Sequence, residues 1–121
     1  MTPSRGHILI IEDEKPLAQA LELKLKKVGY QTAVAYTGKS GLSLMKAREF
    51  DVVLLDLLMP IMDGFEVLAQ INKLPKKPTV FVLSNLGQRE DEKKALAMGA
   101  KKFFIKSNTP LTAIVEQIMM A

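Results

Sequence analysis

The chain has 121 residues, which suits one compact domain and is too short for two separate hydrophobic cores. It has no cysteine, which excludes disulfides and thiolate metal sites. Its net charge of +4 comes from lysines in short scattered groups, without the basic stripe and aromatic residues typical of a nucleic-acid reader. No apolar run approaches the ~20 residues that span a membrane, and no secretory cleavage site follows the N-terminus, so we expect a cytoplasmic protein that binds neither membrane nor nucleic acid directly.

The first part of the chain reads as two strand–helix units. The apolar run His7–Ile11 predicts a buried strand. A helix follows, because leucine and valine recur at helical spacing between Pro16, which is tolerated in a first turn, and Gly29, which suits the position just after a helix. The weaker run 31–36 predicts a second strand, and residues 37–48 predict a second helix.

The rest of the chain repeats this alternation three times. The third, fourth and fifth strands are predicted at the apolar runs 52–55, 79–83 and 103–105. Residues 64–72 predict a third helix and residues 88–98 a fourth, whose thin apolar stripe suggests that it is the least firmly held. The last helix is predicted to have Thr109 as its N-cap and Pro110 as its first residue.

Strands that alternate with helices favour right-handed crossovers and a parallel sheet with helices on both faces. We therefore expect an α/β fold, namely a doubly wound five-stranded parallel sheet with five helices. In such sheets ligands bind at the carboxyl ends of the strands, near the point where the strand order reverses. The functional residues should therefore lie just after the strands.

Polar side chains follow four of the five predicted strands. They are Glu12, Asp13 and Glu14 after the first strand, Asp56 after the third, Ser84 after the fourth and Lys106 after the fifth. Glu12, Asp13 and Asp56 together would carry a charge of about −3 and need a counter-ion, and their oxygens suit a hard cation such as Mg²⁺. With an amine and a hydroxyl to contact phosphoryl oxygens, this set could perform phosphoryl transfer, and a carboxylate can itself be the nucleophile.

The stretch from Asp56 to Gly64 has the pattern D-x-x-M-P-x-M-D-G. With Ile10-Ile11-Glu12-Asp13-Glu14 before it, and Leu83-Ser84 and Phe104-Ile105-Lys106 after it, the chain resembles the receiver domains of two-component response regulators. The resemblance runs over about residues 7–120. It implies one flavodoxin-like receiver domain over residues 1–121, with its core at about 7–120.

The resemblance also implies roles for the strand-end residues. Asp56 would be the phosphorylated residue. Asp13 would bind Mg²⁺ directly and Glu12 directly or through water, and Asp56 and the backbone carbonyl of Leu58 would complete the protein ligands. Ser84 and Lys106 would hold the phosphoryl oxygens.

The implied protein is a phosphorylation-dependent switch rather than an enzyme, since it would catalyse only its own phosphorylation and dephosphorylation. Ser84 and Phe103 would form the switch, and Phe103 should point away from the acidic site, because side chains alternate along a strand. The switch would act through the face formed by the fourth helix, fifth strand and fifth helix. The implied partners are a sensor histidine kinase or histidine phosphotransfer protein and a downstream target or attached output domain. Homodimerisation on phosphorylation is a further option.

Four positions depart from the commonest receiver pattern. Glu12 replaces an aspartate, which favours indirect metal ligation, and Asn85 replaces a smaller residue and could narrow access to Asp56. Ser107 replaces a proline that often forms a cis bond, so we expect a trans Lys106–Ser107 bond. Phe103 has no hydroxyl, so a switch there would work by burial.

Other functions fit the sequence less well. An aspartyl phosphatase of the haloacid-dehalogenase type needs a second aspartate where this chain has Leu58. A flavodoxin-like cofactor binder needs a phosphate loop after the first strand. A non-phosphorylated pseudo-receiver remains the alternative, although it would be expected to lose one of Asp56, Asp13 or Lys106. The sequence leaves open whether the chain is a stand-alone receiver or part of a longer regulator.

Overall fold

The computed structural model describes residues 4–85 and 89–121 and contains one five-stranded parallel sheet. The strands are β1 (His7–Ile11), β2 (Gln31–Ala35), β3 (Val52–Asp56), β4 (Thr79–Ser84) and β5 (Lys102–Ile105). They lie in the order β2-β1-β3-β4-β5, and every neighbouring pair is parallel. The predicted doubly wound α/β fold is therefore confirmed.

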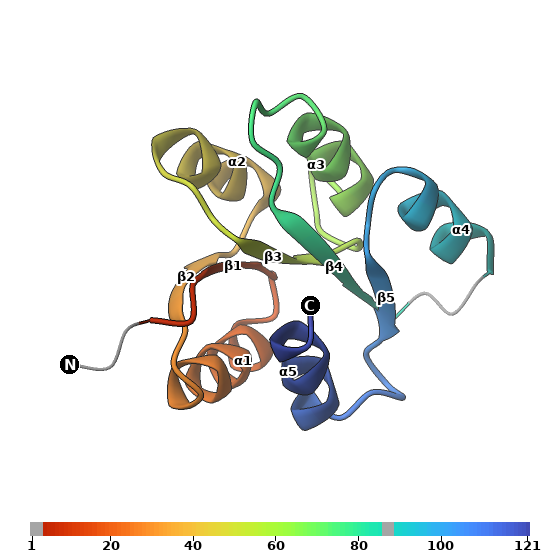
Figure 1. The fold of residues 1–121 in the computed structure, drawn as a ribbon. Helices are drawn as coiled ribbons and strands as arrows, with labels where there is room; N and C mark the ends of the chain where they lie inside the picture. Colours follow the sequence, from red (N-terminus) through yellow and green to blue (C-terminus); the bar gives the residue numbers. More distant parts are fainter. Residues whose placement is uncertain (1–3, 86–88) are drawn as a thin grey trace.

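Within the described residues, five helices cover the two faces of the sheet. They are α1 (Lys15–Lys27), α2 (Gly38–Ala47), α3 (Gly64–Ile71), α4 (Arg89–Ala97) and α5 (Leu111–Met119). α1 and α5 lie on one face, and α2, α3 and α4 lie on the other (Figure 1). Among the described residues, no helix combines the length and apolar character needed to cross a membrane.

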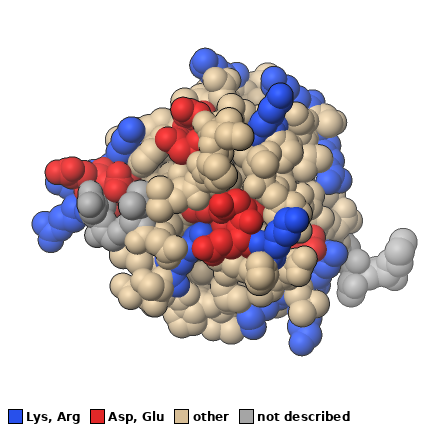
Figure 2. All heavy atoms as spheres, turned by 180° about the vertical axis from the view of Figure 1, so that it is seen from behind, with Lys and Arg blue, Asp and Glu red and all other residues tan. Residues whose placement is uncertain are grey.

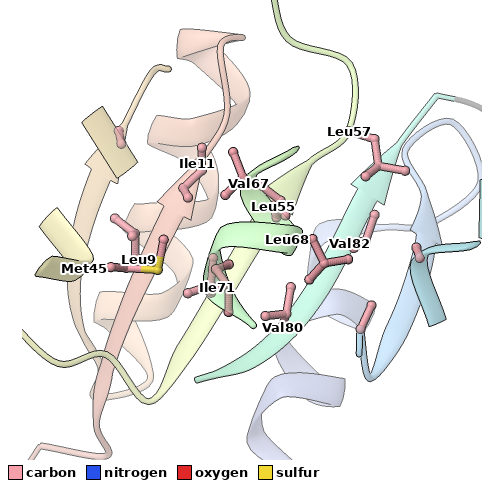
Figure 3. Close-up of a cluster of buried hydrophobic side chains, with 14 of the residues drawn as sticks. Leu9, Ile11, Met45, Leu55, Leu57, Val67, Leu68, Ile71, Val80 and Val82 are labelled. Carbon is pink, nitrogen blue, oxygen red and sulfur yellow. The ribbon is translucent and has the colours of Figure 1, made fainter. Parts of the chain in front are cut away.

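Each face of the sheet has its own hydrophobic core, because strand side chains alternate between the faces. Leu9 and Ile11 of β1 contribute to the core beneath α2 and α3, where Figure 3 shows Ile11 near Val67 and Leu9 near Met45. Ile8 and Ile10 instead belong to the core that includes residues of α1 and α5. The two cores hold the central strands from both sides and fix the positions of their carboxyl ends.

The predicted glycine stop signals after α1 and α4 are confirmed, but the predicted N-cap of α5 is wrong. Gly29 and Gly99 have φ angles of 104° and 105° just after α1 and α4, where glycine avoids a Cβ clash. Thr109, however, is not the N-cap of α5. Pro110 keeps an extended ψ of 147° and occupies that position itself, so the helix begins one residue later than predicted. The predicted start of the fourth helix at Gln88 lies outside the described residues.

The loop after β3 is held tightly against the end of that strand. Asp63 is the N-cap of α3, and its carboxylate accepts a hydrogen bond of 2.9 Å from the Glu66 amide, as expected for a structural rather than catalytic acid. At Gly64 an added Cβ would lie only 2.4 Å from the Asp56 carbonyl oxygen. Glycine at this position therefore lets the start of α3 approach the end of β3.

Candidate functional site

The register of the sheet brings the predicted acids to adjacent strand ends. β1 and β3 are neighbours with Ile11 opposite Leu55, so Glu12 and Asp56, the next residue of each strand path, lie side by side. One carboxylate oxygen from each of Glu12, Asp13 and Asp56 lies within 4.8 Å of the others. Glu12 and Asp56 are only 1% and 2% exposed, whereas Asp13 is half-buried. The three carboxylates among the predicted metal ligands thus form one cluster.

Lys106 reaches this cluster from the end of β5. Its backbone amide donates a 2.9 Å hydrogen bond to the Ser84 carbonyl, which places it beside the end of β4. Its ammonium nitrogen lies 2.6 Å from Glu12 Oε1 and 3.3 Å from Asp56 Oδ2. The Lys106 side chain is 9% exposed, so these are buried charge–charge contacts, in which low solvent screening strengthens the attraction.

Glu14 also contacts Lys106, with its Oε2 at 3.5 Å from the ammonium. The sequence places Glu14 among the acids after the first strand but predicts no role for it. Its position in the sequence does not predict where its long, half-exposed side chain points. In the structure it adds a third carboxylate around the lysine.

Backbone amides hold one oxygen of each buried carboxylate. The Leu58 amide donates to Asp56 Oδ1 and the Glu14 amide donates to Glu12 Oε2, both at 3.1 Å. The other two oxygens, Asp56 Oδ2 and Glu12 Oε1, are buried, accept no well-aligned hydrogen bond in the described part of the chain, and face Lys106 instead. One lysine cannot balance three clustered carboxylates, so the donor set and its excess charge fit a hard divalent cation.

The same crowding changes the proton affinity of Asp56. Burial, the adjacent Glu12 carboxylate and, to a smaller extent, Asp13 raise the pKa of Asp56 to about 8, although Lys106 opposes this. For Lys106, burial alone would lower the pKa, but the carboxylates of Glu12, Asp56 and Glu14 outweigh it and raise the pKa above the usual value. The site therefore favours a proton or a cation next to Asp56.

The remaining predicted site residues lie around this cluster. Ser84 is fully buried at the end of β4. It pairs with Ile105 of β5, the residue that precedes Lys106. Leu58 is half-exposed, and its amide donates the hydrogen bond to Asp56 described above; the role of its carbonyl as a metal ligand stays a prediction. The Lys106–Ser107 bond is trans, since no cis peptide bond occurs among residues 4–85 and 89–121.

Phe103 points away from the acidic cluster, as the strand alternation predicts. It is partly buried and packs against the core that contains Val82 and Ala95, on the α4 side of the sheet. Phe104, its neighbour, stacks on Phe81 in the opposite core, with ring centroids 6.0 Å apart. Phe103 therefore packs beside β4, the strand that precedes α4, and does not face the acidic cluster.

Charged side chains are unevenly spread over the surface. On the face drawn in Figure 2, acidic side chains gather in a central patch, and basic side chains are scattered towards the edges. On this face the lysines and arginines thus form no single basic patch.

Comparison with known proteins decides the family. The pattern of the response regulator receiver domain matches residues 8–118, which is nearly the whole chain. The chain belongs to this family. It is thus a response regulator receiver domain, a class of signalling switches used in phosphorylation-based two-component signalling.

Individual relatives agree with this assignment. The cell cycle response regulator CtrA of Brucella ovis is 34% identical over 99 residues, which are 82% of this chain and 43% of that protein. The chain thus spans less than half the length of the curated relatives it matches. The receiver domain of the Francisella response regulator 1452 superposes with a TM-score of 0.89 at 27% identity, and covers 96% of this chain and 95% of its own. A chain from the CheX-CheY-BeF3-Mg²⁺ complex of Borrelia burgdorferi gives 0.87 at 27% identity, with 94% and 87% covered.

Proposed function

We propose that this receiver accepts a phosphoryl group on Asp56 from a protein phosphohistidine. One observation carries the proposal: the buried Asp56 carboxylate has one oxygen held by the Leu58 amide and the other facing the Lys106 ammonium at 3.3 Å. A nucleophile needs one oxygen free of backbone bonds and a positive charge near the group that it attacks. Oδ2 meets both conditions, whereas Oδ1 is already engaged.

The neighbouring residues supply the other requirements of phosphoryl transfer. Lys106 is close enough to Asp56 to neutralise a phosphoryl oxygen once the group is attached. Ser84, at the end of the adjacent strand, would donate its hydroxyl to another oxygen. Both residues are positioned by the β4–β5 pairing, which fixes them relative to Asp56 before any donor arrives.

Glu12, Asp13, Asp56 and the carbonyl of Leu58 would hold Mg²⁺, as the shared carboxylate space and the buried oxygens suggest. When bound, Mg²⁺ supplies positive charge that offsets the repulsion between the acids and the incoming phosphoryl oxygens. The BeF3 and Mg²⁺ named in the Borrelia complex support this choice of ion. Glu12 is longer than the aspartate usual at its position, so it would bind directly or through water.

The signal would leave the site through Ser84 and Phe103. Movement of Ser84 towards a phosphoryl group would shift the start of the connection to α4, and Phe103 packs on the same side of the sheet. The α4–β5–α5 face would then bind a downstream target, an attached output domain or a second copy of the chain. We place this switch in the cytoplasm and assign residues 1–121 to one receiver domain, whether it stands alone or belongs to a longer regulator.

Intact-mass measurement after incubation with acetyl phosphate and Mg²⁺ tests the proposal. Wild type should gain the mass of one phosphoryl group, and Asp56→Asn should gain none. Asp51→Asn is the matched control, because Asp51 is an exposed acid whose contact is with the His7 amide. Equal labelling of Asp56→Asn and wild type would refute the assignment, and no labelling of wild type would favour the pseudo-receiver.

A further inference from the structure

The basic residues that are scattered along the sequence meet at one edge of the fold. Each helix runs back from the carboxyl edge of the sheet to its amino edge, so residues that end a helix, or connect it to the next strand, lie at the amino edge. Lysine and arginine occupy these places, namely at Arg5 and in the segments 24–27, 46–48, 73–77 and 101–102. We call this edge the basic pole.

Few acids offset the charge of the basic pole. In the connections that lead from a helix to the next strand, the acidic residues are Glu49 and Asp51. Glu49 forms an ion pair with Lys76 at 3.3 Å, and Asp51 accepts a hydrogen bond from the His7 amide. The proposed metal ligands lie at the opposite edge of the sheet. The chain is therefore polarised, and the positive potential of the basic pole attracts anions.

A hollow of about 820 Å³ opens in the basic pole, and its volume is in the range of small-molecule sites. It is lined by residues 4–5, residues 26–31 and Met119, none of which is acidic. Backbone hydrogen bonds of 2.9 Å join its two sides, from the Arg5 amide to the Gly29 carbonyl and from the Gln31 amide to the Gly6 carbonyl. We call it the basic hollow.

Arg5 lies across the turn that follows α1. Its Cγ, Cδ and Nε atoms are within 3.6 Å of the position that a Cβ would take on Gly29. Arg5 and Lys27 form no ion pair in the described part of the chain, whereas Lys26 lies 3.8 Å from Glu22. The dipole of α1 favours lysine in the last turn of that helix, but it does not account for Arg5, which precedes β1.

These side chains have the chemistry of a phosphate site. A planar guanidinium can bind two oxygens of one phosphate, and each ammonium is a point charge for another. A single phosphate, with a charge of about −1.5 to −2, would not balance three cations, whereas linked phosphates would. Tyr30 and Met119 add partly exposed apolar surface against which a flat ring can pack. We propose that the basic hollow binds a nucleoside polyphosphate, with Arg5, Lys26 and Lys27 on its phosphates and Tyr30 beside its base.

Titrations followed by amide NMR test this site without any phosphorylation of Asp56. The probes are adenosine triphosphate, tripolyphosphate and adenosine, in about 0.15 M salt and without divalent cations. Adenosine triphosphate should bind with a Kd below about 1 mM and shift the amides of Arg5, Gly29 and Tyr30 most. It should bind at least as tightly as tripolyphosphate, although its phosphates carry less charge, because its base packs in the hollow. Adenosine alone should give no saturable shift.

Two double variants separate the hollow from the rest of the basic pole. Arg5→Gln with Lys27→Gln should raise the Kd for adenosine triphosphate by about tenfold, because two charge-assisted contacts are lost. Lys73→Gln with Lys77→Gln removes the same charge from exposed residues of the basic pole outside the hollow, and should change the Kd by about twofold at most. Melting curves should show that both double variants fold as wild type does.

Three results would overturn the basic hollow as a nucleotide site. The first is no saturable binding of adenosine triphosphate to wild type, and the second is tighter binding of tripolyphosphate. The third is an equal loss of affinity in the two double variants, which would show a general attraction to the basic pole. A short DNA duplex is added as a further probe. If it bound more tightly than adenosine triphosphate and shifted amides throughout the basic pole, the surface would belong to nucleic acid and the proposal would be wrong.

Discussion

Lys106 Nζ lies closer to Glu12 Oε1, at 2.6 Å, than to Asp56 Oδ2, at 3.3 Å. The lysine therefore makes its shortest ion pair with Glu12, and Asp56 is left with a smaller share of its charge. This arrangement explains why the neighbouring Glu12 raises the pKa of Asp56 more than Lys106 lowers it.

Glu12→Gln should therefore lower the pKa of Asp56 from about 8 towards its ordinary value. The substitution removes a negative charge beside Asp56 and releases Lys106 to pair with it. Titration of the Asp56 carboxyl carbon by NMR in the metal-free protein would measure the change. Glu22→Gln, a half-buried acid on α1 that is bonded to Thr32, is the control and should have no effect. A pKa of Asp56 that stayed the same or rose in Glu12→Gln would contradict this account.

The stability of the metal-free protein should fall as pH rises from about 4 to about 8. The pKa of Asp56 is about 8 in the folded chain against 3.8 for an ordinary aspartate, so the folded state binds more protons than the unfolded state across this window. Stability is lost with increasing pH wherever the folded state binds more protons. Urea unfolding in the presence of a chelator would measure this slope.

Asp56→Asn should flatten that slope, because it keeps the shape of the side chain and removes the charge. At pH 8 it should be more stable than wild type by roughly 1–3 kcal/mol, the range expected when a buried charge without full compensation is removed. Two results would contradict a raised pKa for Asp56. One is a wild-type stability that rises between about pH 4 and 8, and the other is an Asp56→Asn variant less stable than wild type at pH 8.

Asp13→Ala should abolish the thermal stabilisation that Mg²⁺ gives to wild type. Asp13 is the most exposed member of the carboxylate cluster and makes no ion pair with Lys106 among those found in the described residues, so its oxygens are available to a cation. A ligand that binds only the folded state stabilises it by RT ln(1 + L/Kd), where L is the free ligand concentration, so the unfolding temperature rises with ligand concentration. Melting curves over a series of Mg²⁺ concentrations would compare wild type, Asp13→Ala and the control Asp51→Ala. An unchanged Mg²⁺ response in Asp13→Ala would remove Asp13 from the proposed ligands.

Phosphorylation should alter hydrogen exchange in α4 and around Phe103 more than in α1 and α2. α4 buries only Ala95, and Lys94 adds a contact with the Phe65 ring at 4.2 Å, so little holds this helix to the sheet. Exchange would be followed by mass spectrometry with and without beryllofluoride and Mg²⁺. Protection that changed equally in all five helices would show that the signal does not travel through the β4–α4 connection.

The sequence predicted the fold and the acid–lysine cluster because both depend on simple patterns. Apolar runs of strand length alternate with amphipathic helices, and parallel strands must end at one edge, so the residues after β1, β3 and β5 had to meet there. The ends of the elements were less predictable. Pro110 rather than Thr109 caps α5, because a proline at such a boundary can keep an extended ψ as easily as a helical one.

Contacts made by long or strained residues escaped prediction. The reach of Glu14 to Lys106 depends on side-chain rotamers, which periodicity does not report. Ile61 was an unremarkable member of the D-x-x-M-P-x-M-D-G pattern, and only its φ of 71° and full exposure distinguish it. The expectation that Asn85 narrows access to Asp56 stays a prediction. Asn85 is exposed, and the cavity it borders is lined by Lys106 and Ser107.

Chemical mapping of the phosphorylated residue tests the central claim most directly. An aspartyl phosphate is reduced by borohydride to homoserine, and peptide mass spectrometry then locates the modified position. After treatment with a phosphohistidine donor and Mg²⁺, homoserine should appear at position 56 alone. In the variants Lys106→Ala and Asp13→Ala, which lack groups needed for efficient phosphorylation, homoserine should be absent. Homoserine at position 13 or at another aspartate, or phosphorylation that leaves Asp56 unreduced, would contradict the account.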